Sequence, residues 1–215
     1  MELSMTDRIF CDSRSRYKIM YHESVDIDGL ACRREFSRLI QQTGKRIYNR
    51  AHEWCCGHGA IGFQLLEDGL CKHLVLTDKF FTAIQDCLYT QAVNNLHDCV
   101  TIYHSESLAI LPDTEKWDLF VCNPPWRSKI LPGAELSEDL KRKMFDVDWS
   151  LHNHMWQNLR KFLTDDADVY LYEDRRFSSE HTWKQGMQQA NLNLVNIFEY
   201  FGAVSTGYIL HLKPQ

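Results

Sequence analysis

The sequence lacks any apolar run long enough to cross a membrane. Nothing in its 215 residues approaches the roughly 18 consecutive apolar residues that a membrane helix needs. The segment Met1–Arg8 also lacks the basic stretch followed by an apolar run that marks a secretory signal. We therefore expect a cytoplasmic protein without a membrane partner.

Cysteines at metal-ligand spacing are missing too. None of the eight cysteines forms a Cys-x-x-Cys pair, and Cys55 and Cys56 are adjacent. In a reducing compartment, free cysteine packs like a small hydrophobic residue. We expect reduced, mostly buried cysteines and no metal site.

A surplus of positive charge is absent. The formal net charge is -5, which removes the general attraction to phosphate backbones that nucleic-acid-binding proteins use. The only basic groups of note are Lys141–Lys143 and Arg175–Arg176. A nucleic-acid target would therefore need a local basic patch or a partner protein.

Repeats, low-complexity tracts and flexible linkers are also lacking, and this favours one compact domain. From about residue 50, short apolar runs alternate with helical patterns, which is typical of a doubly wound α/β fold. We predict a Rossmann-like, mostly parallel seven-stranded sheet with an antiparallel last strand and helices on both faces. The predicted strands are Ala51–Cys55, His73–Thr77, Val100–Tyr103, Trp117–Cys122, Asp168–Tyr172, Leu192–Phe201 and Tyr208–Leu212. The predicted helices are Ile61–Leu66, Phe80–Asn94, Trp149–Leu163 and Thr182–Ala190.

The first 45 residues differ from the rest. A helical pattern over Asp28–Gln42 follows a segment with Tyr17, Tyr21 and several charges, which we interpret as irregular. We expect residues 1–45 to form an N-terminal helical extension that caps the sheet or acts as a lid on the ligand site. Residues 46–215 would then form the one compact domain.

A glycine-rich loop lies between the first predicted strand and helix of this domain. It reads Glu53-Trp-Cys-Cys-Gly57-His-Gly59-Ala-Ile-Gly62. Glycines let the backbone turn tightly and approach a ligand, and the helix start offers free N–H groups. Glu53 at the strand end could receive an ammonium group. A tight strand-to-helix turn without a ligand is the alternative.

Two further acids follow the next two strands. Asp78 lies some twenty residues past the glycine loop, where a carboxylate can accept both hydroxyls of a ribose. Glu106, in His104-Ser-Glu106, could accept a hydrogen bond from an adenine amino group. Capping of the following helical segment is the alternative for each.

The most specific motif is Asn123-Pro124-Pro125-Trp126, directly after the predicted strand Trp117–Cys122. The prolines fix the backbone and remove N–H donors. The Asn123 side-chain oxygen and the Pro124 carbonyl can then act as paired acceptors for an NH2 group. Trp126 offers a flat face to a planar substrate.

With this motif, the sequence resembles the class I S-adenosylmethionine (SAM)-dependent methyltransferases, in the amino-methylating branch that includes glutamine-amide and adenine-amino methyltransferases. The resemblance implies SAM as cofactor and S-adenosylhomocysteine as product. It implies that Glu53, Cys55, Gly57 and Gly59 hold the methionine part. It further implies that Asp78 binds the ribose, that Glu106 binds the adenine, and that Asn123, Pro124, Pro125 and Trp126 bind the target nitrogen. The sequence departs from the family pattern in two places: Cys55 stands where a glycine is usual, and Glu106 replaces the commoner Asp.

We therefore expect an enzyme, an N-methyltransferase acting on an amino or amide nitrogen. A small-molecule acceptor suits the size and acidic charge, followed by adenine in RNA or DNA and then by glutamine in a protein. A SAM-binding regulatory subunit is the non-enzymatic alternative. Four further residues are candidates for substrate contact: Tyr21, Arg127, Trp149 and His152. The oligomeric state is left open.

Overall fold

The structure is a computed structural model that describes residues 9–14, 16–22, 28–43, 47–129, 141, 143–200 and 206–215. Seven strands form one sheet in the order β5-β4-β3-β6-β7-β9-β8, and β1 and β2 form a second sheet. The chain divides into two compact units, Met1–Glu106 and Ser107–Gln215. The predicted Rossmann-like α/β fold is confirmed, including the antiparallel last strand.

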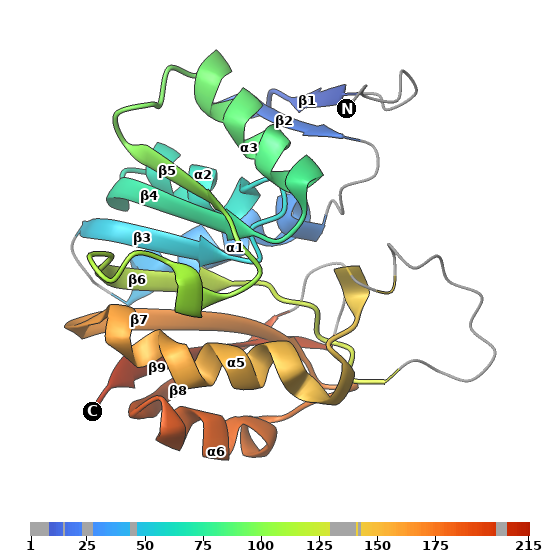
Figure 1. The fold of residues 1–215 in the computed structure, drawn as a ribbon, viewed down its shortest axis with the longest axis vertical. Coiled ribbons are helices and arrows are strands. Elements are labelled where there is room, and N and C mark those ends of the chain that lie inside the picture. Colours follow the sequence, from blue (N-terminus) through green and yellow to red (C-terminus); the bar gives the residue numbers. More distant parts are fainter. Residues whose placement is uncertain are drawn as a thin grey trace. The chain divides into compact units, whose positions relative to one another are not determined.

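The first unit contains three parallel strands: β3 (Tyr48–Trp54), β4 (Cys71–Asp78) and β5 (Val100–His104) (Figure 1). The β4 run Leu74–Leu76 is fully buried, as expected for a strand covered on both faces. The helices α2 (Ala60–Glu67) and α3 (Phe81–Val93) each follow a strand. The carboxyl ends of β3 and β4 thus lead directly into the glycine loop and the Asp78 turn.

The segment before the N-terminal helix is not irregular, and our prediction for it was wrong. It forms an antiparallel hairpin of β1 (Ile9–Asp12) and β2 (Ile19–His22), followed by α1 (Asp28–Gln42). The β2 strand lies against α3, where the backbone N–H of Met20 donates to Thr90 Oγ1 at 2.9 Å. Helix α1 packs on α2. Strand β2 is held by side chains of α3 and β1 by its pairing with β2, so the alternating apolar pattern that we used to find strands is weak in them.

The second unit begins with the short 3-10 turn η1 (Leu108–Ile110) and the buried strand β6 (Trp117–Cys122). Strand β7 (Leu163–Asp174) is parallel to β6, and β9 (Gly207–Pro214) is antiparallel to both β7 and β8 (Leu192–Tyr200). Helices α5 (Ser150–Leu159) and α6 (Glu180–Gln189) pack against each other, and α6 contacts β8. The last hairpin was predicted, although its turn at 201–205 lies outside the described residues.

The predicted helix Trp149–Leu163 is too long. The turn η2 (Val147–Trp149) precedes α5, which ends at Leu159, and η3 (Arg160–Phe162) leads into β7. Strand β7 begins at Leu163, five residues earlier than predicted, because the polar residues Thr164–Asp166 belong to it. An irregular register between β6 and β7 accommodates this polar start, and such polar residues read as a loop in the sequence.

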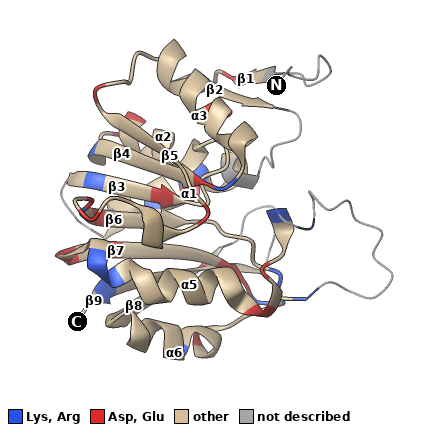
Figure 2. Ribbon diagram, viewed as in Figure 1, with Lys and Arg blue, Asp and Glu red and all other residues tan. Residues whose placement is uncertain are grey.

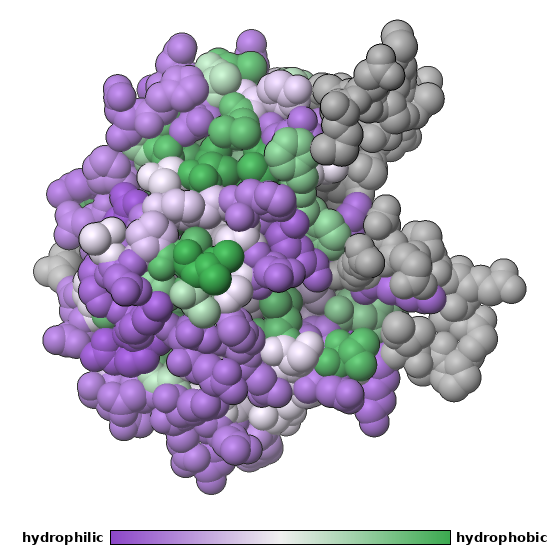
Figure 3. Space-filling view, in the orientation of Figure 1, coloured by the Kyte–Doolittle hydropathy of each residue, from purple (hydrophilic) through white to green (hydrophobic). Residues whose placement is uncertain are grey.

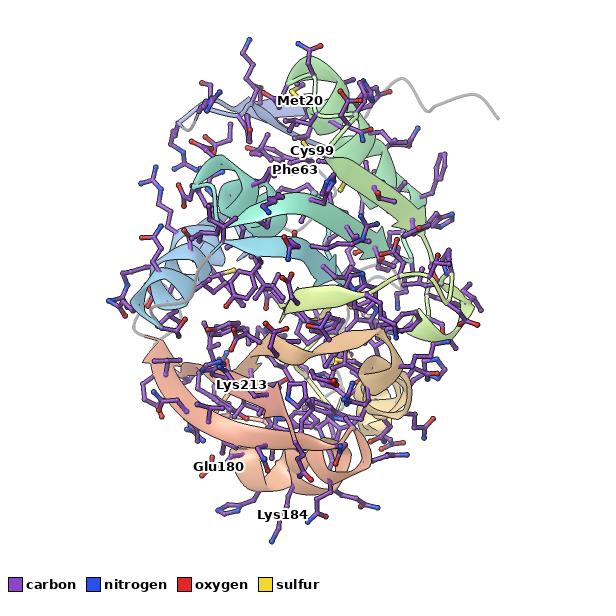
Figure 4. All side chains as sticks on the ribbon, turned by 90° about the vertical axis from the view of Figure 1, so that its left-hand side faces the viewer. Met20, Phe63, Cys99, Glu180, Lys184 and Lys213 are labelled. Atoms are coloured by element: carbon purple, nitrogen blue, oxygen red, sulfur yellow. The ribbon has the colours of Figure 1, made fainter. Side chains whose placement is uncertain are left out.

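Polar side chains cover much of the visible face, with hydrophobic groups between them (Figure 3). The exposed apolar residues of the first unit include a group on α3, namely Phe81, Leu88, Tyr89 and Val93. Figure 4 shows Phe63 of α2 in the interior of the first unit and Lys184 of α6 pointing outward. Within the described ranges, no helix is long and apolar enough to span a membrane.

Candidate cofactor and acceptor sites

The glycine loop of the first unit has three residues in the left-handed backbone region. Cys55, Gly57 and Gly59 have φ values of 54°, 53° and 75°. A Cβ atom on Gly59 would lie 2.8 Å from the Phe63 ring, so this position has no room for a side chain. The half-buried Cys55 adopts a backbone conformation that glycine adopts at lower cost. The structure therefore explains why glycine is usual there in the family that the sequence resembles.

Glu53 lies at the end of β3 beneath this loop. Its carboxylate Oε2 accepts a hydrogen bond from the backbone N–H of Gly62 at 2.7 Å, at the start of α2. The side chain is buried, and this burial raises the pKa of Glu53 to about 8 despite the hydrogen bonds from the backbone of Gly62 and Ile61. A buried carboxylate with a raised pKa is stabilised by a cation, so Glu53 suits an ammonium group.

Asp78 links the glycine loop to the end of β4. Its Oδ2 accepts the backbone N–H of Gly57, and its Oδ1 accepts that of Phe80, each at 2.8 Å. Burial raises the pKa of Asp78, and the hydrogen bonds from Phe80 and Gly57 oppose that shift. Each carboxylate oxygen can accept a second hydrogen bond, so the side chain can receive two hydroxyl groups.

Glu106 is exposed just after β5. The neighbouring Ser105 donates its backbone N–H to the Asp78 carbonyl at 2.9 Å, which places this segment beside the Asp78 turn. Of the predicted cofactor residues, Glu53, Gly57 and Asp78 thus lie in one hydrogen-bonded region, and Glu106 follows a residue that is bonded to it.

His58, between Gly57 and Gly59, is a residue that our sequence reasoning missed. It is 1% exposed, and neither ring nitrogen has a hydrogen-bond partner among the described residues. Burial, together with the nearby charge of Arg33, lowers the pKa of His58 to about 4, so the ring is neutral. Tyr21, predicted to contact the substrate, lies over it with ring centroids 5.6 Å apart. The only feature of the sequence that could have pointed to His58 was its position as a titratable residue between two glycines.

These donors and acceptors fit a SAM molecule. A cation beside Glu53 would offset the cost of burying its ionised carboxylate, and the oriented carboxylate of Asp78 favours a diol. The unpaired nitrogens of His58 offer a buried polar contact at the glycine loop. Among the described residues, no group of three or more His, Cys, Asp or Glu side chains is arranged to hold a metal ion.

The acceptor motif follows β6 in the second unit. Asn123 and Trp126 are partly exposed at the end of this fully buried strand. The Trp126 ring lies 5.6 Å from that of Phe177, and the guanidinium groups of Arg127 and Arg176 lie over it, 4.8 Å and 5.5 Å from its centroid. The motif therefore ends in an aromatic residue whose ring is contacted by two guanidinium groups.

A backbone bridge fixes the chain directly after the motif. Arg127 pairs with Phe145 in an isolated parallel bridge. Its N–H donates to the Met144 carbonyl at 3.3 Å, and its carbonyl accepts the N–H of Asp146 at 2.9 Å. The residues after Trp126 are thereby connected to the turn that precedes α5.

His152 anchors this turn from inside the second unit. Its Nδ1 lies 2.6 Å from Asp146 Oδ2, its Nε2 lies 2.7 Å from Glu173 Oε1, and its ring stacks on Trp183 at 4.5 Å. Burial opposes protonation, but the charges of Glu173 and Asp146 and their hydrogen bonds raise the pKa of His152 to about 9. Because the ring is fully buried and both nitrogens are engaged, it offers no atom to a substrate.

Trp149, the remaining predicted substrate residue, packs beside this network. Its ring lies 4.7 Å from Trp183 and 5.3 Å from His152, both edge to face. The residue is partly exposed and has a left-handed backbone, with φ of 56°. Trp149 therefore closes the turn over His152 and keeps one accessible side.

Comparisons with known proteins agree with this geometry. A family model of the methyltransferase small domain matches residues 37–147, just over half of the chain. No curated protein sequence matches the chain.

Solved structures show the same fold. A ribosomal protein L11 methylase from Lactobacillus delbrueckii subsp. bulgaricus has a TM-score of 0.59 at 14% identity, covering 85% of this chain and 78% of that one. A S-adenosylmethionine-dependent methyltransferase from Clostridium acetobutylicum has a TM-score of 0.59 at 10% identity, covering 88% and 92%.

The 16S rRNA N2 G1207 methyltransferase of T. Thermophilus, solved with AdoMet and guanosine, has a TM-score of 0.66 at 15% identity and covers all of this chain. This chain spans 52% of that protein, about half of its length. These likenesses show the fold, and the family match establishes the cofactor as S-adenosylmethionine. The chain belongs to the methyltransferase small domain family and is a class I SAM-dependent methyltransferase.

Proposed function

We propose that this methyltransferase transfers the methyl group to an amino or amide nitrogen of a small molecule, and that Asn123-Pro124-Pro125-Trp126 holds this nitrogen. The observation that carries the proposal is this rigid motif at the end of a buried strand, with the following residue fixed by the Arg127–Phe145 bridge. Orientation of a reacting group can lower a barrier by several kcal/mol, about 7–11 in favourable cases, so a fixed acceptor loop is what the reaction requires.

Besides orienting the nitrogen, the acceptor motif would stabilise the transition state of methyl transfer. An amide or aromatic amine is a weak nucleophile because its lone pair is delocalised. The Asn123 side-chain oxygen and the Pro124 carbonyl would accept its two hydrogens, favour a pyramidal nitrogen and stabilise the positive charge that develops. No general base is required, since the proton can leave after transfer.

The first unit would hold the cofactor. Glu53 would receive its ammonium group, Asp78 its ribose hydroxyls and Glu106 its adenine amino group, while Cys55, Gly57 and Gly59 shape the loop around the methionine part. The bound cofactor supplies a methyl group already activated on a sulfonium. The N-terminal segment 1–45, whose β2 strand brings Tyr21 to His58, would cover this cofactor site.

A nucleobase amino group in RNA or DNA is the second candidate acceptor. It is favoured by the likeness over the whole chain to the rRNA N2 G1207 methyltransferase solved with guanosine. The net charge of -5 and the small size favour the small molecule. Glutamine in a protein is the third, and a protein acceptor is favoured only by the shared fold of the ribosomal protein L11 methylase.

The test is methyl transfer from labelled SAM to cell extract separated into small-molecule, protein and nucleic-acid fractions. Wild type should label one fraction, and Asn123→Ala should lower the rate by about 100-fold or more. The exposed Asn193→Ala serves as the matched control and should keep the wild-type rate.

Cofactor affinity measured by calorimetry separates chemistry from binding. Asn123→Ala should bind SAM as wild type does. If it methylates as fast as wild type, the role of the motif is wrong. If wild type labels no fraction while still binding SAM, a regulatory SAM-binding subunit becomes the better interpretation of this protein.

A further inference from the structure

Arg127 differs from six of the ten arginines in the described residues. Arg14, Arg33, Arg38, Arg160, Arg175 and Arg176 all form ion pairs with carboxylates. Arg127 has no carboxylate partner in the described part of the chain, and its Nε atom is buried there without a hydrogen-bond acceptor. A partly buried guanidinium without an anion is costly unless a ligand supplies one.

Two aromatic rings hold this guanidinium in place. Its central carbon lies 4.8 Å from the Trp126 ring centroid and 5.6 Å from that of Phe145. The backbone on either side is fixed by the bridge to Phe145. A guanidinium positioned in advance loses little entropy when it binds an anion.

A second guanidinium lies over the same indole. Arg176 is 5.5 Å from the Trp126 centroid and is oriented by Asp174, with Nη2 to Oδ2 at 2.7 Å and Nε to Oδ1 at 3.0 Å. Asp174 balances one of the two positive charges, so the group of Arg127, Arg176 and Asp174 keeps a net positive charge. Arg127 and Arg176, 49 residues apart in the sequence, thus lie over one ring of the second unit, whose Lys and Arg residues are drawn in blue (Figure 2).

We propose that Arg127, assisted by Arg176, binds a phosphate group of the methyl acceptor and makes the enzyme specific for phosphorylated acceptors. This inference rests on the proposed function, because it places the phosphate beside the motif that holds the target nitrogen. The planar fork of a guanidinium matches phosphate oxygens bidentately, and two guanidiniums at one ring suit a phosphate dianion better than a carboxylate. The phosphate belongs either to a free small molecule or to a nucleic-acid strand.

Binding of simple probes tests the proposal without turnover. The full-length chain, saturated with S-adenosylhomocysteine, is titrated in a calorimeter with inorganic phosphate, phenyl phosphate, benzoate and a ten-nucleotide single-stranded RNA. A phosphate-bearing probe should bind wild type, and Arg127→Gln should weaken that binding about tenfold to a hundredfold. Arg34→Gln, the same charge change at an exposed position of α1, should leave it unchanged.

The probes also identify the source of the phosphate. Arg127-dependent binding of phenyl phosphate or inorganic phosphate indicates a phosphorylated small molecule. Arg127-dependent binding of the RNA alone indicates a strand phosphate. The proposal is overturned if no phosphate-bearing probe binds more weakly to Arg127→Gln, or if benzoate binds more tightly than phenyl phosphate in an Arg127-dependent way.

A second variant keeps the test valid if Arg127→Gln fails to fold. Arg127→Lys keeps the charge but not the fork, so it should bind the phosphate probe several-fold more weakly than wild type with unchanged affinity for S-adenosylhomocysteine. Equal phosphate binding by Arg127→Lys and wild type would refute bidentate recognition. Wild-type phosphate binding by Arg127→Gln, with Asn123-dependent methylation intact, would refute this inference alone. Arg127-dependent phosphate binding without any methyl transfer would refute the N-methylation proposal alone.

Discussion

The Nε2 atom of His152 lies 2.7 Å from Oε1 of Glu173, and both side chains are fully buried. Burial raises the pKa of Glu173, and the positive charge of His152 opposes that shift. Asp146 holds the other ring nitrogen, so one imidazolium joins the start of α5 to the end of β7. Since Asp146 also bonds the Arg127 carbonyl, this buried group supports the chain directly after the acceptor motif.

Substitution of His152 should therefore cost much stability. In His152→Gln the two carboxylates lose the cation between them, and breaking such a buried pair typically costs about 3–5 kcal/mol. Urea unfolding of the variant should show a loss of this size. His181→Gln, whose side chain is 87% exposed, should change stability by less than about 0.5 kcal/mol. A loss below about 1 kcal/mol in His152→Gln would mean that the ion pairs contribute little.

The same group predicts how stability depends on pH. The pKa of His152 is raised from 6.5 to about 9 in the folded chain, which therefore holds a proton that the unfolded chain releases. Its stabilisation is complete below the unfolded pKa and is lost as the pH rises through about 9. The stability difference between wild type and His152→Gln should shrink by roughly 3 kcal/mol over this range, as measured by urea unfolding at successive pH values. A constant difference would show that the ring is not charged in the folded protein.

The arrangement around Asp78 could be predicted because its signals are local. A buried strand, a glycine loop and an acid after the next strand are each visible in a short window, and parallel strands bring their carboxyl ends to one edge. The structure adds that Gly57 donates its N–H to Asp78, which ties the two segments together.

The His152 network could not be predicted in the same way. In His152-Asn-His154, the sequence gives two histidines of the same appearance, yet one is fully buried and the other is partly exposed. The difference depends on Glu173, 21 residues further along, and on how β7 meets α5. The β1–β2 hairpin was missed for a related reason, since Thr90 and Asp86, which hold β2, lie on α3, 70 and 64 residues further along the chain.

Cofactor binding should depend on the ionisation of Glu53. Its pKa of about 8 means that the carboxyl group is mostly protonated at pH 6, whereas an ammonium partner requires the carboxylate. The affinity for S-adenosylhomocysteine should therefore rise between pH 6 and pH 8, by up to about tenfold per pH unit, with release of a proton. Calorimetry in buffers of different ionisation enthalpy measures both quantities.

Glu53→Gln is the control for this dependence. It keeps the shape of the side chain and removes the titration, so its affinity should be weaker and nearly constant over the same pH range. An equal slope in wild type and variant would assign the pH dependence to another group.

Replacement of Cys55 by glycine should stabilise the protein. The left-handed backbone at φ of 54° costs a non-glycine residue roughly 1–2 kcal/mol. Glycine avoids that cost but loses about 0.5–1 kcal/mol through its greater freedom in the unfolded chain. Cys55→Gly should thus gain about 0.5–1 kcal/mol in urea unfolding. Cys99→Gly is the matched control, because Cys99 is also partly exposed but lacks a positive φ, and it should lose about the same amount. If both variants are destabilised equally, the backbone at Cys55 carries no strain, and the cysteine at this position must be explained by something other than the backbone conformation.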